Sequence, residues 1–118
     1  MINKVTNSLY ISTTEAGSGK VLVSLGIIEL IMRKTHKVAF FRPVIRRQPL
    51  GKLDEDIELI LSYFALNQTY DSAFGLYVDE VEELIDRSSY NQVLDRIIAK
   101  YKNLEQTYDF ILCEGSDY

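Results

Sequence analysis

A glycine–lysine pair at positions 19 and 20 stands between a strand-like apolar run and a helix-like run, where a phosphate-binding loop belongs. A loop of the form GxxxxGK(S/T) needs glycines so that successive backbone N–H groups wrap a phosphate, a lysine for the β and γ oxygens, and a hydroxyl that holds Mg²⁺. Gly19 and Lys20 are present, but Val21 stands in the place of the hydroxyl, and Thr13 or Thr14 in that of the first glycine. The pattern therefore predicts a degenerate anion-binding loop.

Two further charged residues are expected at the same edge of the sheet as this loop. Arg42 follows the apolar run 37–41 and Glu114 follows the run 108–113, and the carboxyl ends of parallel strands meet where α/β proteins bind ligands. Arg42 offers a fork matched to phosphate or carboxylate, and Glu114 is the acid best placed to hold Mg²⁺ or to orient a water. The predicted ligand-binding residues are Thr13, Thr14, Gly17, Ser18, Gly19, Lys20, Arg42 and Glu114.

Each of these residues also has a structural interpretation. A strand, loop and helix with two glycines often form only a tight turn, and Arg42 and Glu114 would equally well form an ion pair. Cys113, at the end of an apolar strand, is predicted to be a small buried residue, and the sequence indicates neither a catalytic residue nor a metal cluster. No cofactor is certain: ATP or another phosphate-bearing ligand is the candidate, and Val21 removes one of the ligands that Mg²⁺ would use.

Strand-like and helix-like segments alternate along the chain. Three strands are predicted at 7–12, 37–41 and 108–113, the second ending before Pro43 because proline cannot donate to a sheet ladder. Helices are predicted at 19–34, from the Asp54 cap through 66, at 78–87 and at 90–104, and the first is expected to be largely buried. This alternation predicts an α/β domain with a parallel sheet flanked by helices, and the small size of the sheet indicates a truncated domain.

The composition is that of an ordinary globular domain. The 118 residues fit one domain, with 47% hydrophobic and 25% charged residues. The net charge of −4 argues against nucleic acid or an anionic membrane as a partner. The single cysteine, the lack of a secretory signal and the lack of a long apolar span lead us to expect a cytoplasmic protein.

Three segments carry a family resemblance. They read LYISTTEAGSGKVLVSLG at 9–26, VAFFRPV at 38–44 and YDFILCEG at 108–115. In this order and spacing the chain resembles the N-terminal domain of long-form bacterial phosphate acetyltransferases, which is related to dethiobiotin synthetase and to P-loop amidotransferase-type ATPases. The resemblance implies a P-loop NTPase-like fold, of which residues 1–118 form the N-terminal part. The C-terminal domain, which transfers acetyl groups between acetyl phosphate and coenzyme A, is absent.

The resemblance also implies roles and partners. In the related synthetases the loop lysine contacts the nucleotide phosphates, while the following hydroxyl and the acid after the third strand help to bind Mg²⁺. Lys20 and Glu114 match two of these positions, whereas Val21 lacks the hydroxyl and Arg42 replaces a lysine before the proline. A regulatory and oligomer-stabilising domain is implied, with the rest of its polypeptide and further copies as partners. An ATP-dependent ligase of the dethiobiotin synthetase type and a stand-alone nucleotide or metabolite sensor stay open as alternatives.

Overall fold

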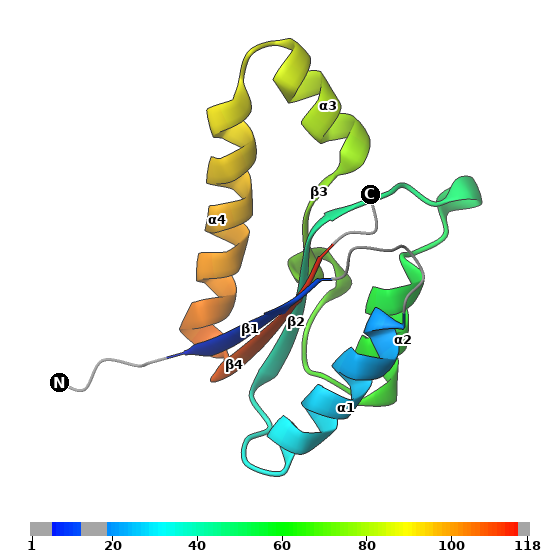
Figure 1. Cartoon of the computed structure of the whole chain (residues 1–118), viewed down its shortest axis with the longest axis vertical. Coiled ribbons are helices and arrows are strands. Elements are labelled where there is room, and N and C mark those ends of the chain that lie inside the picture. Colours follow the sequence, from blue (N-terminus) through cyan, green and yellow to red (C-terminus); the bar gives the residue numbers. More distant parts are fainter. Residues whose placement is uncertain (1–5, 13–18, 116–118) are drawn as a thin grey trace, which may run out of the picture.

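A four-stranded parallel sheet with helices on both faces forms the framework of the chain (Figure 1). The computed structural model describes residues 6–12 and 19–115. The strands are β1 (Asn7–Ile11), β2 (Val38–Ile45), β3 (Phe74–Tyr77) and β4 (Phe110–Glu114), in the order β1-β4-β2-β3. The helices are α1 (Lys20–Met32), α2 (Glu55–Tyr63), α3 (Val78–Asp86) and α4 (Tyr90–Thr107), with short 3-10 turns at Pro49–Gly51 and Tyr70–Ala73.

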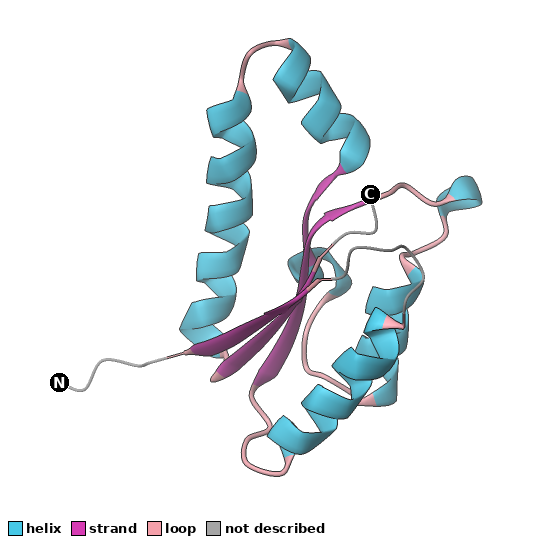
Figure 2. Ribbon diagram, in the orientation of Figure 1, coloured by secondary structure: helices cyan, strands magenta, loops and turns pink. Residues whose placement is uncertain are grey.

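The strand order decides which face each helix covers. The chain crosses from β1 to β2 and on to β3 in one direction, then returns to place β4 between β1 and β2. Because crossovers between parallel strands are right-handed, the returning connection must lie on the opposite face from the first two. Figure 2 shows this arrangement, with α1 and α2 on one face of the sheet and α4 on the other. The predicted α/β class is confirmed.

The second strand is longer than predicted, and a fourth strand pairs with it. The pairing of β2 with β4 ends at Phe41, and β3 then pairs with Arg42, Val44 and Ile45. Pro43 belongs to neither register, so its missing N–H breaks no ladder. The predictions that this strand ends before the proline and that the sheet has three strands were therefore wrong.

The unpredicted strand β3 is short, and beside it a glutamine side chain forms hydrogen bonds with the backbone of β2. A Cβ on Gly75 would lie 2.5 Å from the carbonyl oxygen of Pro43, so this close strand approach requires glycine. Below β3, the N–H of Phe40 donates to Oε1 of Gln68 at 2.9 Å, and Nε2 of Gln68 donates to the carbonyl of Phe40 at 2.8 Å. The side-chain amide of Gln68 therefore makes the two hydrogen bonds to β2 that the backbone of a neighbouring strand would otherwise make.

Alternate residues of the central strands build two apolar cores. Buried residues on the α1 and α2 side are Ile28, Val38, Phe40, Ile45, Ile57, Ile60, Ala73, Phe74 and Leu112. Buried residues on the α4 side are Ala39, Phe41, Leu104, Ile111 and Cys113. The alternation follows from the two-residue period of a strand, in which successive side chains point to opposite faces.

Helix α1 packs against the sheet through a single row of residues. Its buried residues are Lys20, Ser24 and Ile28, spaced four apart, whereas Leu22 and Leu30 are 71% and 58% exposed. The prediction that this helix is largely buried was wrong, because only one face touches the sheet. Among residues 6–12 and 19–115, no helix combines the length and the apolarity that a membrane crossing needs.

Candidate anion-binding site

The strand alternation that builds the first core also places two charged residues on the face of the sheet that α1 and α2 cover. Arg42 follows Val38 and Phe40 on the same side of β2, and Glu114 follows Leu112 on the same side of β4. The prediction that Arg42 stands after its strand was wrong, because pairing with β3 places it inside β2. The predicted meeting of Arg42 with Glu114 is nevertheless confirmed, since the parallel strands bring them to one edge of the sheet.

Every buried polar or charged residue in the described part of the chain belongs to one group. We call Lys20, Ser24, Arg42, Asp54 and Glu114 the buried charged cluster; none is more than 5% exposed. Lys20 and Ser24 come from the buried stripe of α1, and Asp54 immediately precedes α2. Charges removed from water cost folding free energy unless they are paired, which makes this group the candidate site of the chain.

Arg42 is the centre of the cluster. Its Nη1 donates to Oδ2 of Asp54 at 2.7 Å, and its Nε lies 3.4 Å from Oε1 of Glu114. Its Nη2 lies 3.5 Å from the carbonyl oxygen of Gly115, where it makes a long hydrogen bond. The predicted ion pair of Arg42 with Glu114 is confirmed, although the shorter pair is with Asp54.

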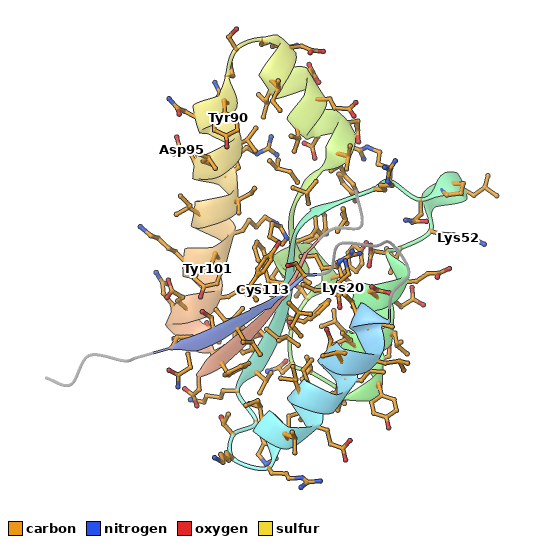
Figure 3. All side chains as sticks on the ribbon, in the orientation of Figure 1. Lys20, Lys52, Tyr90, Asp95, Tyr101 and Cys113 are labelled. Atoms are coloured by element: carbon orange, nitrogen blue, oxygen red, sulfur yellow. The ribbon has the colours of Figure 1, made fainter. Side chains whose placement is uncertain are left out.

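Lys20 reaches the same sheet edge from the start of α1 (Figure 3). Its Nζ donates to the carbonyl oxygen of Gly115 at 2.7 Å, so the loop lysine is anchored to the residue that follows β4. Gly19, immediately before the helix, has φ +88°, a left-handed backbone that favours glycine. The glycine–lysine pair therefore turns the chain into α1 and directs the lysine toward the strand ends.

Glu114 is fully buried and its ionisation is suppressed. The hydroxyl of Ser24 donates to Oε2 of Glu114 at 2.8 Å. Burial, followed by the neighbouring Asp56 carboxyl, raises the pKa of Glu114 to about 7, while the Ser24 hydrogen bond and the charge of Arg42 act in the opposite direction. The acid predicted at this position therefore keeps its proton between about pH 4.5 and 7, where an exposed glutamate is ionised.

Asp54 has two functions, of which the sequence indicated one. The predicted cap is confirmed, because Oδ1 of Asp54 accepts the N–H of Ile57 at 3.0 Å. Its other oxygen binds Arg42, and its own N–H donates to the hydroxyl of Tyr70 at 2.8 Å. The pairing with Arg42 spans a loop whose path follows no periodic pattern, so no sequence signal pointed to it.

A family model described as AAA domain matches residues 7–118. The chain belongs to the AAA domain family. A phosphate acetyltransferase of Synechocystis is 55% identical over 114 residues, and one of Nitratidesulfovibrio vulgaris is 44% identical; each match covers 97% of this chain and 16% of the relative. An ATP-dependent dethiobiotin synthetase BioD of Clostridium acetobutylicum is 25% identical over 92% of this chain and 48% of its own length.

These relatives confirm the resemblance that the three sequence segments indicated. They also show that this AAA domain spans only about a sixth of the phosphate acetyltransferases and about half of the synthetase.

The structure brings together half of the predicted site residues. Gly19, Lys20, Arg42 and Glu114 lie within the described part of the AAA domain and meet at one sheet edge. The other four predictions lie outside the described residues: Thr13, Thr14, Gly17 and Ser18. That any of the eight contacts a ligand stays a prediction.

Two predictions about chemistry outside the cluster can be compared with the structure. Cys113 is 8% exposed, as predicted for a small buried residue, and burial raises the pKa of its thiol to about 11. Within the described ranges, no three histidine, cysteine, aspartate or glutamate side chains are grouped as a metal site would need.

Proposed function

We propose that this AAA domain is a non-catalytic, anion-binding domain of a longer phosphate acetyltransferase. The observation that carries the proposal is that all described buried charges gather in one place: Lys20 at the start of α1, Arg42 within β2, Asp54 before α2 and Glu114 at the end of β4. The high identity to phosphate acetyltransferases, over a small share of their length, supports the assignment to such an enzyme.

The ligand of this site is a phosphate-bearing molecule held at the N-terminal end of α1. Backbone N–H groups at a helix N-terminus and the partial positive charge of the helix favour an anion there, and Lys20 adds a positive charge. A cavity of about 220 Å³ that Arg42 lines is also lined by three acids, Asp54, Glu55 and Asp56. Those carboxylates disfavour phosphate, so the start of α1 is the better position.

Acetyl transfer between acetyl phosphate and coenzyme A is assigned to residues outside this chain. In the described part of the chain the thiol of Cys113 is buried and its raised pKa keeps it protonated at neutral pH. The domain then acts on the enzyme by regulation and by stabilising the oligomer, with the rest of the polypeptide and a second copy as its partners.

Isothermal titration with ATP, in buffer that contains EDTA, tests the proposal. Wild type should bind ATP, Lys20→Met should lose binding, and Lys52→Met should retain it. Lys52 is the matched control because it is an exposed lysine that Figure 3 shows pointing away from the cluster. Circular dichroism of each variant checks folding. Binding that survives Lys20→Met, or no binding by wild type, contradicts the anion-binding assignment.

The chain alone should also show no acetyltransferase activity. Acetyl transfer by the purified 118-residue chain would overturn the non-catalytic assignment. Turnover of ATP would instead favour the synthetase-type ligase, the second function that the 25% identity to a dethiobiotin synthetase supports.

A further inference from the structure

We propose that the Arg42 guanidinium permanently takes the place of a divalent cation between the carboxylates of Asp54 and Glu114. The complete loop motif uses a hydroxyl to hold Mg²⁺, so the residues present must be tested for their fit to that ion. They do not fit it. The proposal concerns the same site as the proposed function, but it holds whether or not an anion binds there.

Three of the four oxygens of the two acids accept hydrogen bonds, and the fourth lies beside Arg42. Both oxygens of Asp54 accept hydrogen bonds, one from the Ile57 N–H and one from Arg42. Of the Glu114 oxygens, Oε2 accepts from Ser24, and Oε1 lies 3.4 Å from the Arg42 guanidinium. A metal ion that bridged the two acids would compete with the arginine for the oxygens between them, because Mg²⁺ needs direct oxygen contacts at about 2.1 Å.

Two buried atoms of the cluster that lack hydrogen bonds also indicate that Arg42 occupies the position of a cation. Within the described residues, Nε of Arg42 and Oε1 of Glu114 are the buried side-chain polar atoms without a hydrogen bond, and they face each other. The opposite charge nearest the carboxylate oxygen is therefore the guanidinium itself. Val21, which stands at the hydroxyl position, offers no oxygen that would recruit a metal from the helix side.

Fixed positive charges already lie beside the two acids. Lys20 and Arg42 carry two positive charges, against at most three negative ones on Asp54, Glu114 and Asp56, the carboxyl next to Glu114. Arginine keeps its proton at any physiological pH, so Arg42 cannot make room for a cation by becoming neutral. A divalent ion added here would meet two fixed cations in a site of low dielectric, where repulsion is strong.

Removal of the arginine should create the metal site that it replaces. In Arg42→Met, Asp54 and Glu114 lose their shared cation, so we expect the melting temperature to fall and then to rise again on addition of millimolar Mn²⁺. The double variant Arg42→Met/Glu114→Gln lacks one of the two carboxylates, and its melting temperature should not respond to Mn²⁺. Arg47→Met is the matched control, because Arg47 forms an exposed ion pair with Asp79.

Electron paramagnetic resonance of free Mn²⁺ supplies a second measurement that uses the wild type alone. Wild type should bind no Mn²⁺ in the range that rescues Arg42→Met. Saturable one-to-one binding by wild type that Glu114→Gln abolishes would overturn the proposal, and so would a folded Arg42→Met that ignores Mn²⁺. If Arg42→Met does not fold even with Mn²⁺, the wild-type titration still decides. Loss of ATP binding in any variant bears on the proposed function and leaves this result unchanged.

Discussion

The buried carboxyl of Glu114 predicts an unusual pH dependence of stability. Its pKa rises from an ordinary 4.5 to about 7 in the folded chain. Between these values the folded state holds a proton that the unfolded state has lost, so the free energy of unfolding falls as pH rises. Each pKa unit corresponds to about 1.4 kcal/mol, so the total loss is on the order of 3 kcal/mol, complete above about pH 7.

Glu114→Gln removes this titration while keeping the size of the side chain and an oxygen for the Ser24 hydroxyl. Urea unfolding followed by circular dichroism, from about pH 5 to pH 8 at constant ionic strength, gives the stability difference between variant and wild type. The free energy of unfolding of the variant, relative to that of the wild type, should increase as pH rises and become constant above about pH 7. Glu58→Gln removes an exposed carboxylate from α2 and serves as the control. A difference that is independent of pH, or that grows toward low pH, would refute this account of Glu114.

Three further outcomes are expected. Asp54→Ala should destabilise the chain by roughly 3 kcal/mol because it removes the shorter of the two ion pairs of the buried Arg42. Asp54→Asn should cost less because it keeps the cap. The exposed control Asp79→Ala should cost about 1 kcal/mol or less in the same urea assay. The thiol of Cys113 should not react with a disulfide reagent such as DTNB until the chain is unfolded in urea; rapid reaction in the native state contradicts its burial. Gly75→Ala places a Cβ 2.5 Å from the backbone of β2 and should lower the free energy of unfolding by about 1–3 kcal/mol. Gly26→Ala, which adds a Cβ in open space on a helix, should raise it by roughly 0.5–1 kcal/mol. Equal effects of the two substitutions would show that the close approach of β3 to β2 is unimportant.

Local sequence patterns predicted the framework well because each depends on neighbours in the chain. The apolar runs of the strands and the Asp54 cap were visible from the sequence alone, and the parallel sheet then brought Arg42 toward Glu114. The β3 strand was missed because it is only four residues long and contains Gly75, and its pairing is what carries β2 past Pro43.

The remaining errors come from contacts that sequence spacing does not encode. Arg42 forms its shorter ion pair with Asp54, across a loop, and this pairing depends on where α2 begins in space. The apolar residues of α1 lie around most of its circumference, so their spacing alone did not show which face meets the sheet. Lys20, Ser24 and Ile28 form that face, which leaves Leu22 and Leu30 exposed.

The anion-binding assignment requires that this domain bind its ligand without help from a divalent metal. Titration of ATP into the wild-type chain, once in EDTA and once with excess Mg²⁺, tests it most directly. Lys20 and the N-terminal end of α1 should bind ATP at least as tightly in EDTA as in Mg²⁺, with no release of phosphate in either buffer. Tight binding that appears only with Mg²⁺, accompanied by ATP turnover, would contradict the claim.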